Sequence, residues 1–203
     1  MKNIITIQHT QSVHHTNGMI GSLTEWDLTD LGKAQAECIG VNMQRFIGND
    51  AYVLYSSNQI RARQTADIIA RHLGLGYITD ERLREQDLGE AVGKSEEWAH
   101  KNTIVWMKNV DDRPFNGAET NREKWNNLLP FVNQIIESKD ENSIIISHGG
   151  TLRIFAAIWL GFEIEDLNCC DFGGLSGGVS IFQENSDGKR IIKRLNDMSF
   201  LKE

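Results

Sequence analysis

The sequence lacks several features that would indicate a membrane, secreted or nucleic-acid-binding protein. None of its 203 residues belongs to an apolar run of about 18 or more, the length of a bilayer-spanning helix. Its N-terminus, MKNIITIQHT, holds an apolar run too short for a signal-peptide core and no small-residue cleavage site. The net charge is −7 and the Lys and Arg residues form no cluster. We therefore expect a cytoplasmic protein that binds neither membrane nor nucleic acid.

Cysteine pairs and flexible linkers are also missing. The three cysteines, Cys38, Cys169 and Cys170, are an odd number without CxxC spacing, which argues against a disulfide framework and a zinc knuckle. No internal repeat, low-complexity tract or linker rich in Pro, Gly or Ser interrupts the chain. The length suits one domain, or at most two small ones, with a substantial core.

Short β-branched runs alternate with amphipathic segments along the chain. Thr29 and Thr120 are expected to cap helices that run to about residues 46 and 138, and Ser56 and Gln59 have the spacing of a capping box for a helix that ends near residue 74. The runs 4–7, 51–55 and 144–146 predict strands buried on both faces, and 179–183 with 191–195 predict a hairpin. This alternation predicts an α/β layered fold with a largely parallel sheet.

The stretch from residue 80 to 119 has no clear period, and Trp98 and Trp106 lie in it among charged residues. We treat residues 1–203 as a single domain in which 86–118 forms a lid or a specificity insertion.

Polar clusters follow each of the three predicted buried strands directly. They span residues 8–12, 56–61 and 147–150. Because ligands of such sheets gather beyond the carboxyl ends of the strands, we expect His9, Arg61 and His148 to meet at one rim.

These residue types suit phosphoryl transfer. A neutral imidazole such as His9 can attack phosphorus and form a covalent intermediate. The guanidinium of Arg61 can bind two phosphate oxygens, and His148, if protonated, would supply a second charged donor. Glu85 is the candidate acid that protonates the leaving oxygen, with Glu90 as the next choice. This chemistry requires no metal and no cofactor.

The segments that carry these residues resemble the motifs of the histidine phosphatase superfamily, in its phosphoglycerate mutase-like branch. Gln-His-Thr-Gln-Ser at 8–12 is a variant of the family's Arg-His-Gly-Glu-Ser/Thr. Residues 56–66, Ser-Ser-Asn-Gln-Ile-Arg-Ala-Arg-Gln-Thr-Ala, are similar to the segment with the second arginine, and 147–153, Ser-His-Gly-Gly-Thr-Leu-Arg, match the second histidine segment closely. Weaker matches at 28–36, 83–89 and 116–120 follow in the family's order.

The resemblance implies a three-layer α/β/α fold of the phosphoglycerate mutase type with a mostly parallel central sheet. It implies that His9 is phosphorylated, that Arg61 and His148 hold the phosphoryl group and that Glu85 is the proton donor. Other residues in or near these motifs are expected to bind the substrate: Gln8, Thr10, Ser12, His15, Ser57, Asn58 and Gly149.

The first motif and the residues after it depart from the family at three positions. Gln8 stands where the family has arginine, Thr10 replaces glycine, and His15 stands where the family often has asparagine. We hypothesise that His14 or His15 partly replaces the missing arginine. A metal site at His14 and His15 is not expected, since adjacent residues on a strand point in opposite directions.

The leading interpretation is a metal-independent phosphomonoesterase that acts on a small phosphorylated metabolite through a phosphohistidine. The alternative is a weak or silent relative that binds a phosphorylated ligand or a protein partner, because the loss of one charged donor can cost a factor of about 10²–10³ in rate. A mutase of the phosphoglycerate type ranks lower, since residues 90–116 show no clear match to the mutase substrate loop.

Overall fold

The protein is described by a computed structural model that covers residues 1–138 and 142–202. Its centre is a mixed sheet of six strands in the order β3-β2-β4-β1-β5-β6. Four strands are parallel, and β5 is antiparallel to both β1 and β6. The strands are β1 (Lys2–Gln8), β2 (Tyr52–Ser57), β3 (Tyr77–Asp80), β4 (Asn142–Ser147), β5 (Val179–Glu184) and β6 (Arg190–Asp197). The α/β architecture and the terminal hairpin agree with the sequence prediction, whereas β3 was not anticipated.

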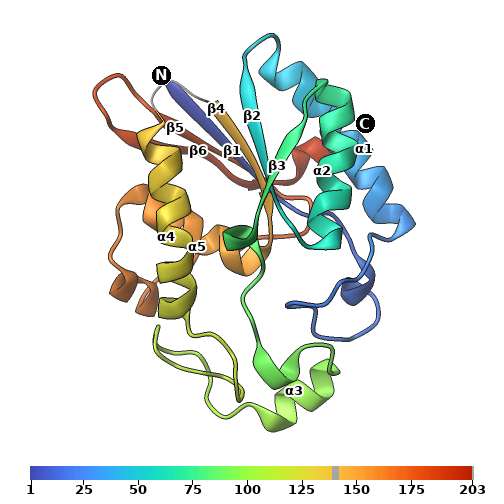
Figure 1. Ribbon diagram of the computed structural model, residues 1–203, viewed down its shortest axis with the longest axis vertical. Helices are drawn as coiled ribbons and strands as arrows, with labels where there is room; N and C mark the ends of the chain where they lie inside the picture. The colour runs from blue at the N-terminus through green and yellow to red at the C-terminus, as the bar shows by residue number, and fades with distance from the viewer. Residues whose placement is uncertain (139–141, 203) are drawn as a thin grey trace.

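Helices cover both faces of this sheet (Figure 1). One layer contains α1 (Asp30–Ile47) and α2 (Ile60–Leu73), and the other contains α4 (Asn121–Glu137) and α5 (Gly149–Leu160). The central strands are buried on both faces because alternate isoleucines serve the two layers: Ile5 and Ile7 pack towards α1 and α2, and Ile4 packs towards α4 and α5. The result is a three-layer α/β/α domain.

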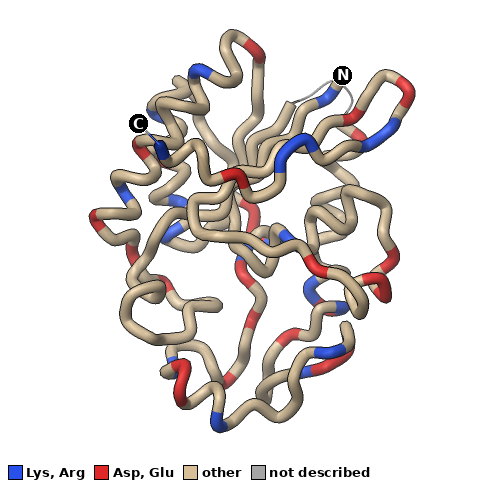
Figure 2. The backbone as a smooth tube through the Cα atoms, turned by 180° about the vertical axis from the view of Figure 1, so that it is seen from behind, with Lys and Arg blue, Asp and Glu red and all other residues tan. Residues whose placement is uncertain are grey.

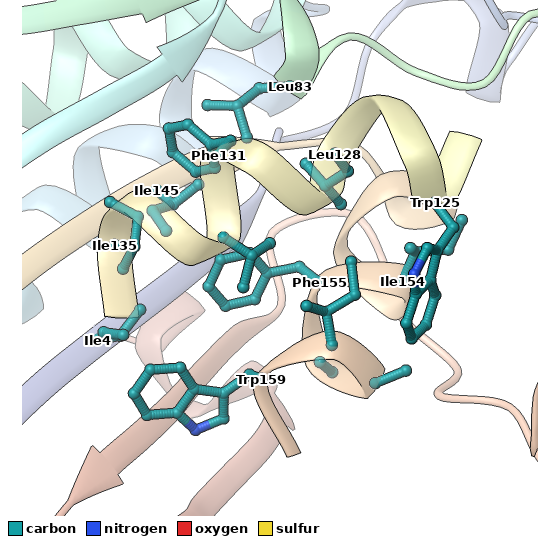
Figure 3. Packing of buried hydrophobic residues seen from close by; sticks show 14 of the residues in the cluster. Ile4, Leu83, Trp125, Leu128, Phe131, Ile135, Ile145, Ile154, Phe155 and Trp159 are labelled. Carbon is teal, nitrogen blue, oxygen red and sulfur yellow. The ribbon is translucent and has the colours of Figure 1, made fainter. Parts of the chain in front are cut away.

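The larger core lies between the sheet and the layer of α4 and α5. Figure 3 shows Phe131 of α4 and Phe155 and Trp159 of α5 turned towards the sheet, and each of the three is 0% exposed. Phe155 also contacts Phe182 of β5, with ring centroids 5.8 Å apart. This core holds α5 against the sheet, and His148 lies directly before the first residue of α5.

Two of the three predicted helix starts are confirmed. Thr29 accepts a hydrogen bond from the backbone N–H of Gly32 at 3.0 Å, and Thr120 forms a capping box with Glu123. The predicted capping box of Ser56 and Gln59 is wrong. Gln59 is the residue before α2, and its side chain makes no cap hydrogen bond because it reaches across to other segments of the site.

The segment 86–118 extends beyond the sheet. It contains a short 3₁₀ helix, η3 (Gly89–Ala91), and α3 (Glu96–Asn102), and Figure 1 shows α3 at the end of the molecule opposite the N-terminus. Its buried residues Ala91, Ala99 and Phe115 form a small core of their own, against which Ile20 packs. No helix within residues 1–138 and 142–202 is long and apolar enough to cross a membrane.

Charged side chains are distributed over the whole molecule. Figure 2 shows Lys and Arg interspersed with Asp and Glu along the chain, without a continuous basic stripe. Any anionic ligand is therefore held by local charges.

Candidate active site

His9 lies immediately after β1, with its side chain only 2% exposed. Its backbone N–H donates to the Ser147 carbonyl at 2.9 Å, which joins the ends of β1 and β4. Nδ1 of His9 lies 2.9 Å from the Thr10 carbonyl, and Nε2 accepts a hydrogen bond from Nε of Arg61 at 3.1 Å. Because a carbonyl accepts and Nε of arginine donates, the neutral ring carries its proton on Nδ1 and a lone pair on Nε2. The ring therefore presents a nucleophilic nitrogen at Nε2.

Arg61 lies in the first turn of α2 and is 1% exposed. Besides its bond to His9, the guanidinium donates to the carbonyl oxygens of Thr24 and Ser22, both at 2.7 Å. A guanidinium has five N–H donors, so two are left for a ligand. Burial lowers the pKa of Arg61 to about 10, a value at which it is still charged at neutral pH. Arg61 is thus a fixed positive charge beside the lone pair of His9.

His148 lies between β4 and α5, with its side chain 0% exposed. Its Nε2 lies 2.9 Å from the Ser57 hydroxyl, and its Nδ1 is buried with no hydrogen-bond partner. The ring centroids of His148 and His9 are 5.0 Å apart. A buried nitrogen without a partner is costly, and a phosphoryl oxygen could satisfy it by accepting from Nδ1–H. Burial, and to a smaller extent Arg61, hold the pKa of His148 well below its usual value, so His148 would donate as a neutral ring and not as a second charged donor.

Ser12, His14 and His15 form a polar wall next to His9. The segment Val13–His15 is a 3₁₀ helix rather than a strand, so the premise that its two histidines point in opposite directions is wrong. The backbone N–H of Ser12 donates to Nδ1 of His15 at 3.1 Å, which leaves the proton of the neutral ring on Nε2. The rings of His15 and His9 are stacked, with centroids 5.4 Å apart. His15 therefore carries an N–H donor close to His9.

His14 completes this wall. Its Nδ1 lies 2.6 Å from the Ser12 hydroxyl, and its ring stacks over Trp26. Burial, with smaller contributions from His15 and Arg61, lowers the pKa of His14 to about 3. His14 is therefore neutral at physiological pH.

The three imidazoles of His9, His14 and His15 are close enough to be considered as a metal site, since one nitrogen of each lies within 4.8 Å of the others. Two observations favour an anion instead. The lone pairs of His9 Nε2 and His15 Nδ1 already accept hydrogen bonds, and the guanidinium of Arg61 is adjacent to the first. A cation there would displace these donors and lie next to a buried positive charge.

Glu85 faces the same pocket from the segment that follows β3. One carboxylate oxygen accepts a hydrogen bond from the backbone N–H of Gly150 at 3.2 Å, and the other accepts from the N–H of Gln86 at 2.9 Å. The alternative acid, Glu90, is exposed, and its carboxylate accepts from the side chain of Asn116 at 3.1 Å. Of these two carboxylates, Glu85 is the one that lies at the start of α5 beside His148.

The other predicted substrate-binding residues are placed around this centre. Gln8 lies against Gly149 at the start of α5. Thr10 directs its hydroxyl to Thr65 at 3.3 Å, and Asn58 accepts a hydrogen bond from Arg84 at 3.2 Å. Thr10 therefore contributes chiefly through its carbonyl, which orients the ring of His9.

Sequence reasoning missed two buried residues that hold the site together. The Gln59 amide donates to the Ser22 carbonyl at 2.9 Å and accepts from the backbone N–H of Glu85 at 2.8 Å. Lys124 of α4, 1% exposed, donates to the carbonyl of Arg84 at 2.5 Å. Gln59 was visible as part of a motif, but no local signal marked Lys124, because its partner is 40 residues away in sequence.

Beside Glu85 lies an open cleft of about 470 Å³. It is lined by His14, His15, residues 19–22, Gly150, Glu96 and three residues of the segment that starts at Glu85. His14 and His15 both line this cleft and lie beside His9, so a phosphoester bound at His9 would extend its alcohol part into the cleft.

The pH dependence of activity should reflect the environment of His9. Burial, and to a smaller extent Arg61, hold the pKa of His9 well below its usual value of 6.5. Only a neutral imidazole can act as a nucleophile, so a lowered pKa would keep His9 competent as the pH falls. With an ordinary pKa, roughly three-quarters of the rings would be protonated at pH 6. We expect kcat/KM, measured between pH 5 and 8 and corrected for ionisation of the substrate, to show no inflection near 6.5; such an inflection would contradict this assignment.

Comparison with known proteins identifies the family of this chain. The model of the histidine phosphatase superfamily (branch 1) matches residues 4–198. A protein of Hydrogenobacter thermophilus named "Putative phosphoserine phosphatase 2" is 33% identical over 171 residues, which are 82% of this chain and 83% of that protein. The 2,3-bisphosphoglycerate-dependent phosphoglycerate mutase of Nitrobacter winogradskyi is 25% identical over 197 residues, 91% of this chain and 92% of the mutase. The structure of Bacillus stearothermophilus YhfR superimposes with a TM-score of 0.84 at 19% identity and covers 100% of both chains.

Proposed function

Because this chain belongs to the histidine phosphatase superfamily, we propose that it is a phosphatase that hydrolyses small phosphomonoesters through a phosphohistidine at His9, without a metal. The observation that carries the proposal is the arrangement around His9 Nε2. Its lone pair accepts a hydrogen bond from the buried Arg61. The adjacent ring is that of His148, whose buried Nδ1 has no hydrogen-bond partner. Such a pocket offers a nucleophile and donors for a tetrahedral anion.

In the first step, the Arg61 Nε–H that occupies the lone pair of His9 Nε2 turns to a phosphoryl oxygen. The freed Nε2 attacks phosphorus while the bond from phosphorus to the ester oxygen breaks. Glu85 gives its proton to the departing oxygen, so that the leaving group is a neutral alcohol. Phosphorylation makes the ring of His9 cationic, and the Thr10 carbonyl that accepts from Nδ1 stabilises this charge. Arg61, His148 and the Nε2–H of His15 are the proposed donors to the phosphoryl oxygens.

In the second step, water attacks the phosphohistidine. The Glu85 carboxylate takes a proton from the water as its oxygen bonds to phosphorus, and the N–P bond breaks. Inorganic phosphate leaves, His9 is neutral again and Glu85 is protonated for the next cycle. The proton gained by Glu85 in this step is the one it gives up in the first.

Two other functions use the same pocket. A phosphoglycerate mutase would return the phosphoryl group to a bound sugar acid, which the similarity to the Nitrobacter winogradskyi mutase favours. A weak or silent phosphoester-binding protein is favoured by Gln8, which supplies a neutral side chain beside Gly149 where the family has a charged one.

The test is to supply an aryl phosphate and 3-phosphoglycerate, with a chelator present, and to measure both phosphate release and phosphoryl transfer. A phosphatase releases phosphate faster than it transfers it, and chelation leaves the rate unchanged. Transfer that exceeds release would identify a mutase. Binding of inorganic phosphate without turnover of any phosphoester would identify the silent relative.

We propose that His15 supplies part of the phosphate binding that the missing arginine would provide. His15→Ala should raise the inhibition constant for inorganic phosphate by roughly tenfold, since a hydrogen bond to a charged group contributes about 1.5–3 kcal/mol. His15→Asn retains an N–H donor and should restore most of the affinity. The matched control is His100→Ala, because His100 is exposed, contacts Trp106 and does not line the cleft. An unchanged constant in His15→Ala would exclude His15 as a phosphate ligand.

A further inference from the structure

The two ends of the site differ in charge. The phosphate end contains one buried positive charge, Arg61, beside the neutral imidazoles of His9, His14, His15 and His148. The cleft that would receive the alcohol part has two carboxylates, Glu85 and Glu96, and among the described residues that line it none is Lys or Arg. Its remaining wall includes the apolar side chains of Met19, Ile20 and Leu88.

The position of Glu96 at the cleft is fixed by backbone pairing between two loops. Ile20 donates its N–H to the Lys94 carbonyl at 2.7 Å and accepts from the N–H of Gly93 at 3.0 Å. The N–H of Glu96 donates to the Gly18 carbonyl at 2.9 Å, and Ser95 caps the helix that Glu96 begins. Glu96 and Ile20 are therefore held on the same rim, although 76 positions separate them in the sequence.

The basic side chains of the surrounding segments are engaged elsewhere. Lys94 lies over the ring of Trp98 at 5.8 Å, and Arg113 pairs with Glu123 at 2.6 Å. Arg84 pairs with Glu25 at 3.3 Å on the other side of Glu85. Moving any of them into the cleft would break its present contact. A carboxylate on the alcohol part of a substrate would therefore meet the negative charge of Glu96 with no basic side chain among the described lining residues to offset it.

We propose that this enzyme selects phosphomonoesters whose alcohol part carries no negative charge, and that Glu96 makes an amino group on that part favourable. The apolar side chains of Met19, Ile20 and Leu88 would pack against its carbon atoms. The inference rests on the proposed phosphatase function and narrows its substrate class. Glu96 acts here as a specificity-determining residue and has no part in the transfer step.

Three esters of similar size test this preference: phosphoethanolamine with an ammonium group, glycerol phosphate with a neutral alcohol part, and 3-phosphoglycerate with a carboxylate. We expect kcat/KM to fall in that order, with a difference of roughly tenfold or more between the first and the last. Glu96→Lys should shrink or invert the ratio of the first to the last. Glu97→Lys is the matched control, because it makes the same charge change one residue later, where Glu97 pairs with Lys101 and does not line the cleft.

The outcomes separate this inference from the proposed function. Hydrolysis that favours 3-phosphoglycerate, or an equal shift in Glu96→Lys and Glu97→Lys, would overturn the substrate preference and leave the phosphatase function standing. If none of the esters is hydrolysed, the phosphatase function fails, and calorimetric titration of the same three esters still decides the preference. Binding in the expected order supports it, and binding in any other order, or none, overturns it.

Discussion

Replacing His9 with glutamine is expected to lower kcat for phosphate release by at least about 10⁴-fold, because it removes the nucleophile and with it the covalent route. Glutamine keeps polar atoms near the end of the side chain and should leave the fold intact. In the wild-type enzyme, rapid quenching at alkaline pH during turnover should trap an acid-labile phosphoryl group on the peptide that contains His9. The measurements are steady-state phosphate release and mass spectrometry of the quenched digest.

The control for this experiment is His100→Gln, which makes the same substitution at an exposed histidine outside the pocket. It should keep the wild-type rate, and both variants should unfold at the wild-type denaturant midpoint. If His9→Gln kept more than a few per cent of the wild-type rate, His9 would not be the nucleophile. A phosphoryl group trapped on another residue would assign that role elsewhere.

The largest expected effect on stability comes from the core between the sheet and α5. Phe155→Ala should lower the free energy of unfolding by about 3–5 kcal/mol, because it removes a fully buried ring and leaves a cavity. The ring of Phe155 packs edge-on against Phe182, so the gap would open directly beneath α5 (Figure 3). Chemical denaturation monitored by tryptophan fluorescence measures this loss.

Phe46→Ala is the matched control, since Phe46 is 46% exposed at the end of α1 and touches Phe200 at one edge. It should cost less than half as much as Phe155→Ala. Equal losses of unfolding free energy in the two variants would mean that the buried core beside α5 stabilises the protein no more than a surface contact does. A loss below about 1 kcal/mol for Phe155→Ala would lead to the same conclusion.

Much of the fold was predictable because its signals are local. Ile4, Ile5 and Ile7 read as a strand buried on both faces, and the caps at Thr29 and Thr120 marked the starts of α1 and α4. β3 escaped prediction because it is a short strand at the sheet edge, with Ile78 54% exposed and little apolar periodicity. The capping box predicted for Ser56 and Gln59 was wrong for a different reason. The Gln59 side chain forms hydrogen bonds with Ser22 and Glu85, which are distant in sequence, and none with the start of α2.

The sequence by itself determined the α/β class, the order of the main elements and the identity of the residues at the carboxyl ends of the strands. Strand and helix signals depend on neighbours within a few positions, and the strand ends bring His9, Arg61 and His148 to one rim. Only the tertiary structure decided which nitrogen of His9 holds the lone pair, that His14 and His15 share a 3₁₀ turn, and that Glu96 lines the same cleft as these two histidines. Each of these depends on contacts between segments remote in sequence, and hydrogen-bond direction and local charge are set by those contacts.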